Sequence, residues 1–207
     1  MTVIAFTLVM PHTGKRQAAE DRARQLGGIY AKHGASVKVA NVVSGLNAGC
    51  IALIRGYEDF RAATKTFEAI SSDPEHIEFW KQREVNPAAD IVIARDIARR
   101  IFGQGKWETH PVSLIRRYSL ARNRVADAIK LLAEVEKVVS EADVNVGGLL
   151  PVTSDDMSSL SVSYQFRSVE HFGEASDTVA TSEQFQALVA KGAELGTLRS
   201  AFMMVPL

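Results

Sequence analysis

The sequence predicts an α+β protein made of two consecutive copies of one unit, each with the order strand, helix, strand, strand, helix, strand. Two patterns lead to this prediction. Apolar residues alternate in short segments and recur every three or four positions in longer ones, as expected of strands and helices. The same order of segments occurs twice within the 207 residues, and such self-similarity at a fixed period indicates repeated structural units.

The first copy covers residues 1–101. Its strands are rich in Val and Ile, and turns containing Gly or Pro separate them. Gly34 is placed to end the first helix. Asp73 followed by Pro74 is typical of a helix start, because Asp caps free amides and Pro fits the first helical position. We expect strand 1–10, helix 14–34, strands 37–43 and 50–55, helices 60–70 and 74–83, and strand 91–94.

The second copy covers residues 112–207, and residues 102–111 form a linker with two glycines and a proline. Corresponding residues in the two copies are 109, 107 and 112 positions apart, namely Val3 and Val112, Val37 and Val144, and Phe60 and Phe172. We expect strand 112–120, helix 125–139, strands 144–152 and 160–167, a helical segment over 172–179, a helix from residue 183, and strand 200–205.

Composition excludes several classes of protein. The 24 basic and 24 acidic residues cancel, which removes the positive field on which sequence-independent nucleic-acid binding depends. The first apolar run ends at Pro11 without a basic leader, so we predict neither a signal peptide nor a membrane anchor. Cys50 is the only cysteine and lies in an apolar stretch. We therefore expect a buried thiol, no intrachain disulfide and a cytoplasmic location.

The strand and helix order of each copy is that of the ferredoxin-like unit. An antiparallel sheet with both helices on one face leaves its other face bare, and a second copy is the obvious cover for it. The whole chain resembles the dimeric α/β-barrel superfamily, with the two sheets packed face to face within one chain. The resemblance implies a small-molecule ligand and a function as a cofactor-independent monooxygenase or isomerase of small aromatic or polyketide-like compounds.

Residues 56–61 and 72–81 resemble, more narrowly, the NIPSNAP-like branch of that superfamily, where an aromatic and an arginine open the second helix and an Asp-Pro-Glu cap precedes an aromatic helix. This resemblance implies an alternative function as a non-catalytic binding or stress-related module that forms a homo-oligomer. The superfamily also includes haem proteins, which gives a haem-binding barrel as a second alternative. The haem-degrading pattern needs an asparagine on the first strand. Both first strands lack one, so we predict no cofactor and disfavour haem.

The strand expected over 160–167 alternates strictly between apolar and polar residues. Its apolar face should meet the helices, and its polar face should point into the barrel if the two sheets close. With Arg117 from the first strand of the second copy, that polar face would line a cavity for an anionic or oxygen-bearing ligand. The alternative is a solvated sheet face that binds nothing. The polar residues of the strand are Ser161, Ser163, Gln165 and Arg167.

The first copy should give the cavity an apolar side. Small or apolar residues occupy the strand positions expected to face inward, namely Val3, Ala5 and Thr7 with Ala52 and either Ile54 or Leu53. His76 and Trp80, four residues apart on one helix, form a second candidate ligand site, although such a pair more often packs a helix. The other histidines lack metal-ligand spacing, so we predict no metal site. The catalytic residues cannot be assigned.

Overall fold

The structure is a computed structural model that describes residues 2–207, without the side chains of Ala94 and Arg95. Eight strands and six α-helices follow one another in the expected order in this part of the chain. The first half contains β1 (Val3–Pro11), α1 (Arg16–Lys32), β2 (Ser36–Gly45), β3 (Ile51–Tyr57), α2 (Phe60–Ser71), α3 (Pro74–Val85) and β4 (Ala89–Phe102). The second half contains β5 (Val112–Leu120), η1 (Arg122–Arg124), α4 (Val125–Ser140), β6 (Asn145–Thr153), β7 (Ser159–Phe166), α5 (Val169–Thr178), α6 (Glu183–Leu195) and β8 (Gly196–Pro206).

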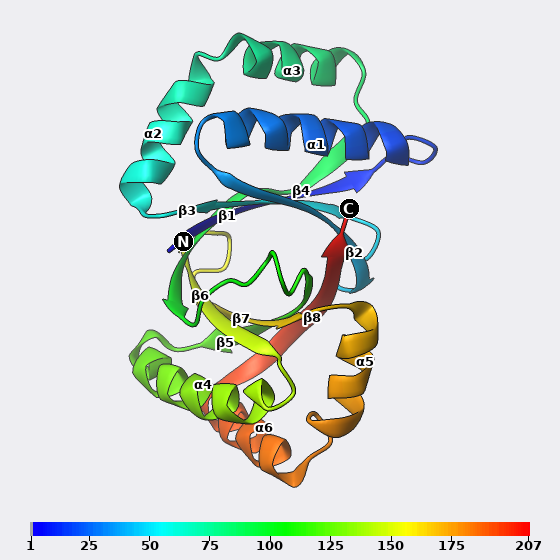
Figure 1. Ribbon diagram of the computed structural model, residues 1–207. Helices are drawn as coiled ribbons and strands as arrows, with labels where there is room; N and C mark the ends of the chain where they lie inside the picture. Colours follow the sequence, from blue (N-terminus) through cyan, green and yellow to red (C-terminus); the bar gives the residue numbers. More distant parts are fainter. Residues whose placement is uncertain (1) are drawn as a thin grey trace.

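The strands form one closed antiparallel barrel in the order β1-β3-β2-β8-β5-β7-β6-β4. Figure 1 looks into this ring, with α1, α2 and α3 on one side and α4, α5 and α6 on the other. The sequence predicts two antiparallel sheets that close face to face into a barrel, and the strands do form a closed ring. The halves join edge to edge, β2 with β8 and β4 with β6, because hydrogen bonding across these two junctions satisfies backbone groups that open edges would leave unpaired.

The two halves repeat not only the order of elements but also the pairing register of their central strands. In the first half Val3 pairs with Tyr57, and in the second Val112 pairs with Phe166. Every pair of the first ladder recurs in the second with both residues 109 positions further along the chain. Residues with this spacing therefore occupy equivalent positions on the two sheets, which allows the halves to be compared side chain by side chain.

The starts of the outer helices are explained by their capping residues. Asp59 accepts a hydrogen bond from the amide of Ala62 at the start of α2. Asp73 accepts one from the amide of Glu75 at the start of α3, with Pro74 in the first helical turn as expected. In the second half, Ser182 does the same for α6. Such caps satisfy amides that have no partner within the helix.

Apolar side chains fill both faces of the barrel wall. Between the strands and the helices, one core cluster contains Leu160, Val162, Tyr164 and Phe166 of β7, as their alternation predicts. A separate cluster inside the ring contains residues of both halves. It includes Cys50, which is fully buried, and burial raises the pKa of its thiol. The ring cluster comprises Ile4, Leu8, Ala40, Val42, Cys50, Ala52, Ile54, Phe202 and Met204.

One expected strand face is wrong. We expected Val3, Ala5 and Thr7 of β1 to face the inside of the barrel, with Leu53 as an alternative to Ile54. Val3, Ala5 and Leu53 belong instead to the core cluster under α1. Ile4 and Phe6 face the inside, as Ile54 does. The segment is apolar at both odd and even positions, so alternation alone does not determine which residues face inward.

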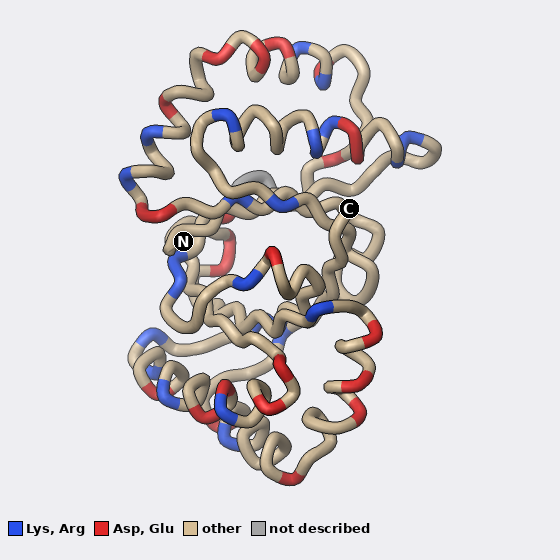
Figure 2. The backbone as a smooth tube through the Cα atoms, viewed as in Figure 1, with Lys and Arg blue, Asp and Glu red and all other residues tan. Residues whose placement is uncertain are grey.

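The last strand of the first half is much longer than expected. We expected a strand over 91–94, but β4 runs from Ala89 to Phe102 and has irregular register with β1. β4 thus ends at Phe102, and the division into two units joined by a linker over 102–111 stays a prediction. Figure 2 shows that most charged residues lie on the outward helices, with fewer on the strands and on the loop within the ring. No helix among residues 2–207 is long and apolar enough to cross a membrane.

Candidate functional site

Two cavities lie on opposite faces of the strands of the second half. The first, here called the lumen cavity, lies inside the ring and has a volume of about 110 Å³. The second, here called the outer cavity, lies between the outer face of β5, β7 and β8 and the helices α4 and α6, with a volume of about 290 Å³. Alternate residues of β5 and β7 therefore serve different cavities.

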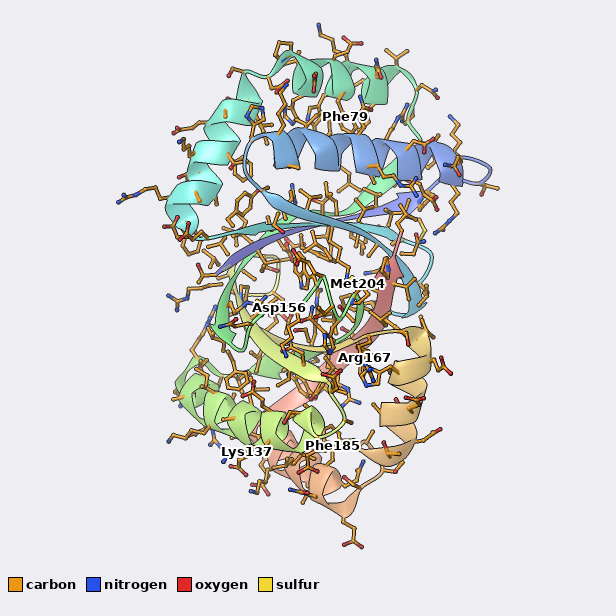
Figure 3. All side chains as sticks on the ribbon, in the orientation of Figure 1. Phe79, Lys137, Asp156, Arg167, Phe185 and Met204 are labelled. Atoms are coloured by element: carbon orange, nitrogen blue, oxygen red, sulfur yellow. The ribbon has the colours of Figure 1, made fainter. Side chains whose placement is uncertain are left out.

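The lumen cavity brings together three of the site residues expected from sequence. Arg117 of β5 and Ser163 and Gln165 of β7 all line it, together with Ser159 and Ser161. Arg167 does not line it. At the end of β7 its guanidinium nitrogen Nε lies 3.1 Å from a carboxylate oxygen of Asp143, and its side chain is 59% exposed (Figure 3). The strand ends at Phe166, so the alternation that places the other residues inward no longer applies.

The opposite wall of the lumen cavity is apolar. The sequence predicts such a wall, because the inward positions expected in the first half are small or apolar. Ile4, Phe6 and Ile54 come from the first half, and Phe202 and Met204 come from β8. Figure 3 shows Met204 inside the ring. The Phe6 and Phe202 rings lie 6.5 Å apart. A bound molecule would therefore meet aromatic and aliphatic groups on one side and hydroxyl groups on the other.

Charged residues that the sequence reasoning missed also line the lumen cavity, namely Lys38, Asp96 and Arg100. The amine of Lys38 donates to the carbonyl oxygen of Pro111, and burial lowers its pKa to about 8. Burial also lowers the pKa of Arg100. Asp96 accepts a hydrogen bond of 2.9 Å from Ser154. Lys38 could have been found, since it alternates with Val37 and Val39, whereas Asp96 and Arg100 lie beyond the expected end of their strand.

The loop over residues 103–111 lies across the ring opening seen in Figure 1. Its backbone is held by Gln165, which is 2% exposed and whose side-chain oxygen accepts from the amide of Lys106 at 3.0 Å. The side-chain nitrogen of Asn145 bridges the same oxygen and the carbonyl of Gln104, at 2.7 Å each. Trp107 of this loop lines the cavity, and the Lys38 amine lies 5.9 Å from the centre of its ring. Gln165 therefore holds the loop in place and is not available as a free ligand group on that oxygen.

The outer cavity is almost entirely apolar. Its polar groups are Arg116 and Tyr118 of β5, Tyr164 of β7 and Thr197. The Arg116 guanidinium carbon lies 5.5 Å from the centre of the Tyr164 ring. Phe185 meets Tyr164 edge to face, with 6.5 Å between ring centres, and lies between α6 and the strands (Figure 3). The aliphatic lining comprises Leu120, Ala128, Leu131, Leu132, Val135, Leu160, Val162, Leu188, Val189, Ala193, Leu195 and Leu198.

The phenol of Tyr164 stays protonated at physiological pH. Burial is the main cause of the raised pKa of this group; Tyr118 raises it further, and Arg116 partly opposes the shift. A protonated phenol can donate a hydrogen bond to an oxygen atom. With Arg116 beside it, the polar corner of the outer cavity is suited to an oxygen substituent that carries partial or full negative charge.

His76 and Trp80, the second candidate pair, line neither cavity. Trp80 donates a hydrogen bond of 2.8 Å to His76, and its ring packs edge to face on Phe79 at 5.5 Å. Arg83 covers the ring, with its guanidinium carbon 5.0 Å from the ring centre. Their helix α3 lies on α1, away from the ring (Figure 1). These contacts are those of a helix-packing pair, the alternative that the sequence left open.

The residues of the outer cavity do not fit haem. Haem iron takes an axial ligand such as His, Cys, Met or a Tyr phenolate. None of the described residues lining this cavity is His, Cys or Met, and the raised pKa of Tyr164 opposes a phenolate. Across the described residues, no three His, Cys, Asp or Glu side chains form a group able to hold a metal ion.

The barrel is similar to several solved structures. A candidate monooxygenase from Fusobacterium nucleatum matches with a TM-score of 0.69 at 6% identity, covering 100% of this chain and 93% of that one. An anthrone oxidase-like protein matches with a TM-score of 0.61 at 10% identity, covering 99% and 91%. The chain shares their fold. A haem-degrading enzyme from Listeria monocytogenes has a TM-score of 0.53 at 10% identity, with 97% and 98% covered.

These similarities show the fold of the chain and nothing finer. Sequence identities of 6% to 10% carry information about the fold and not about the reaction, because one fold hosts many functions. No protein-family model matches this sequence, and no curated protein matches it. The function must therefore be argued from the two cavities.

Proposed function

We propose that this chain binds a small aromatic or polyketide-like compound in the outer cavity and oxidises it as a cofactor-independent monooxygenase. The observation that carries the proposal is the cavity wall, where apolar side chains surround Arg116, Tyr118 and Tyr164. The volume of about 290 Å³ is close to the lower limit of roughly 300 Å³ for small-ligand sites. Two neighbours of the same fold are named as a monooxygenase and as anthrone oxidase-like, which supports oxygenation as the reaction to test.

The polar corner would act on an oxygen substituent of the bound compound. Tyr164 donates a hydrogen bond to that oxygen, and the Arg116 cation stabilises the enolate that forms when an adjacent methylene loses a proton. An electron-rich enolate reacts with dioxygen directly. The methylene becomes a carbonyl, one oxygen atom enters the product, and the other leaves as water with the two hydrogens of the methylene. Four electrons pass from carbon to dioxygen, so no other reductant is needed.

The residues that line the outer cavity do not favour an isomerase, the other activity that the family resemblance implies. Among the described residues lining the outer cavity there is no Asp, Glu, His or Lys. An isomerase needs a base that takes a proton from one carbon and returns it to another. A compound acidic enough to ionise without such a base needs only stabilisation of its anion. The outer cavity therefore favours oxidation of an easily ionised compound over isomerisation.

Oxygen uptake with a hydroxylated anthrone tests this proposal. We expect one dioxygen consumed for each anthrone converted, at a rate above that of the same solution without protein. Arg116→Met should lower kcat/KM at least tenfold, because a hydrogen bond to a charged group contributes about 1.5–3 kcal/mol. Leu188→Trp, which fills the cavity, should raise KM strongly.

Arg117→Met is the matched control, since the neighbouring residue faces the lumen cavity instead. It should leave the oxygen-uptake rate unchanged. Equal rates for the wild type and Arg116→Met would place the reaction elsewhere. No uptake above the solution rate, with any of a panel of anthrones and related phenols, would remove the oxygenase proposal.

The lack of a base also favours a second candidate, a non-catalytic module of the NIPSNAP-like kind suggested by residues 56–61 and 72–81. In that case the anthrone would bind, and Arg116→Met would weaken binding, but no oxygen would be consumed.

We propose further that the protein functions without haem in the cytoplasm, possesses two tandem-duplicated units and assembles with itself. The repeated strand register supports duplication. An unchanged haemin spectrum on addition of the protein would support the absence of haem.

A further inference from the structure

Among the described side chains that line the lumen cavity, Lys38, Arg100 and Arg117 are basic and Asp96 is acidic. Asp156 lies near both Arg117 and Arg199. Even with Asp96 assigned to Arg100 and Asp156 to Arg117, the Lys38 amine has no carboxylate of its own among these residues. Buried charges are normally compensated by a partner of opposite sign, so an anion would complete this site.

Lys38 shows the imbalance most clearly. Its amine donates to the carbonyl of Pro111 and lies 5.9 Å from the centre of the Trp107 ring. A carbonyl and an aromatic ring carry only partial negative charge, and no ion pair joins Lys38 to a described carboxylate within 4.0 Å. An anionic ligand would therefore offset the cost of holding this amine charged away from water.

The remaining walls indicate what kind of anion fits. Ile4, Phe6, Ile54 and Phe202 form an apolar side, which an inorganic anion would leave unused. The volume of about 110 Å³ is of the order of the roughly 150 Å³ cavity known to bind benzene in another protein. One ring fits this space, whereas a fused-ring compound does not. On the polar side, Ser159 and Ser163 donate their hydroxyls to the carbonyls of Asp156 and Gly147, whereas the hydroxyl of Ser161, which also lines the cavity, can donate to a carboxylate oxygen.

We propose that the lumen cavity is a binding site for a single-ring aromatic carboxylate. The ring lies against Phe6 and Phe202, and the carboxylate faces Lys38, Arg100 and Arg117. Trp107 and the loop over 103–111 cover the bound molecule at the ring opening. The site is separate from the outer cavity and does not rest on the reaction proposed there, because the two cavities lie on opposite faces of β5 and β7.

Trp107 provides a direct reporter of the site. The chain has two tryptophans, and Trp80 lies on α3, so Trp80→Phe leaves only Trp107 as a fluorophore. We expect benzoate to change the Trp107 emission saturably. Benzamide, which has the same shape without the charge, should bind at least tenfold more weakly. Calorimetric titration of the unsubstituted protein provides the matching dissociation constants.

Neighbouring arginines provide a matched pair of variants. Arg117→Met should weaken benzoate binding at least tenfold, whereas Arg116→Met, on the opposite face of β5, should leave it unchanged. The anthrone reaction should show the reverse pattern. Failure of either cavity's proposal is thereby distinguished from failure of the other, since each has its own ligand and its own arginine.

The pH dependence of binding tests Lys38 in particular. The charged groups that face it across the cavity are Asp96 and Arg100 of β4 and Arg117 of β5, and benzoate stays ionised above pH 6. As the pH rises through about 8 the amine of Lys38 loses its proton, so benzoate affinity should fall. Lys38→Arg, which stays charged, should keep the affinity and remove this fall.

Lys38→Met should weaken binding at least tenfold at pH 7, and Lys38→Arg gives the same information if the methionine variant does not fold. Three results would each overturn the proposal. These are equal affinity for benzoate and benzamide, full benzoate affinity in Arg117→Met, and no saturable signal by either fluorescence or calorimetry at millimolar benzoate.

Discussion

The interface between strands and helices is closed in the first half and open in the second. The first half leaves a cavity of about 60 Å³ beneath α1 and α3, compared with about 290 Å³ beneath α4 and α6. The strands beneath both interfaces pair in the same register. The difference must therefore come from the side chains placed on a common backbone and from the way the helices pack over them.

Equivalent strand positions show how the first half is filled. Arg55, the counterpart of Tyr164, is 2% exposed. It donates to Thr7, the counterpart of Arg116, at 2.6 Å, and its guanidinium carbon lies 4.7 Å from the centre of the Tyr30 ring on α1. In the second half the arginine is on the neighbouring strand, and α4 carries no aromatic residue to cover it. Space remains where the first half has a stacked guanidinium and phenol.

The largest expected effect is on Arg55. Arg55→Ala should lower the free energy of unfolding by about 3 kcal/mol, because it leaves a cavity in a closed interface and removes the hydrogen bond to Thr7. Arg116→Ala, beside an existing cavity, should lower it by about 1 kcal/mol or less. Urea unfolding of both variants measures the difference. Equal losses would mean that the two interfaces are closed to the same degree in solution.

Replacing two helix glycines by alanine should have smaller effects on the free energy of unfolding, and the two effects should differ in sign. A methyl group at Gly192 on α6 would lie 3.6 Å from Leu131, in ordinary contact, whereas one at Gly27 on α1 would lie 3.0 Å from Val37. Gly192→Ala should therefore raise the free energy of unfolding by about 0.5–1 kcal/mol through helix propensity. Gly27→Ala should lower it by roughly 1 kcal/mol through overpacking.

Thermal unfolding of the two alanine variants, each compared with the unsubstituted protein, measures both signs in one experiment. Stabilisation by Gly27→Ala would show that α1 can move away from the strands, and the contrast between closed and open interfaces would then be weaker than the structure indicates.

The smallest effect concerns the caps of the equivalent helices. A hydrogen bond from His33 is the main cause of the lowered pKa of the Asp73 carboxylate, with the amide of Glu75 and Lys32 adding to it. Because the carboxylate has a lower pKa folded than unfolded, its contribution is present above about pH 4 and is lost as the pH falls further. Ser182 caps α6 without a charge.

Asp73→Ser copies the uncharged cap of the second half. We expect it to be less stable than the unsubstituted protein at pH 7, by a margin that narrows between about pH 4 and pH 2.5 because the unfolded carboxylate takes up its proton first. Urea midpoints at these pH values measure the margin. A difference that stays constant between these pH values would show that the ion pairs of Asp73 add nothing beyond the cap itself.

The polar face of β7 could be predicted from sequence because its alternation is strict. Ser161, Ser163 and Gln165 line the lumen cavity as expected. The face of β1 could not, since Ile4 and Phe6 are as apolar as Val3 and Ala5. The charged side chains of β4 made its second half look unlike a strand, although Asp96 and Arg100 in fact face the lumen cavity.

The outer cavity had no signal in the sequence at all. Leu132 and Val135 of α4 and Leu188 of α6 lie on the apolar stripes of their helices. An apolar stripe predicts that a helix packs on a sheet, but it does not predict how far the helix lies from that sheet. Strand alternation assigns Arg117 to the inward face, but it does not show that Arg116 on the other face borders a cavity. Helix spacing depends on the sum of many side-chain volumes, which local patterns do not report.

Closure of the ring has a consequence for how the chain is made. β8 (Gly196–Pro206) pairs with both β2 and β5, so hydrogen bonding around the ring can be completed only after the ribosome has released these residues. Until then the nascent first half has two unpaired edge strands, β2 and β4, and the apolar inner face of its sheet is exposed to solvent. Such intermediates associate readily with one another, so slower translation or chaperone shielding over this interval should increase the yield of native protein.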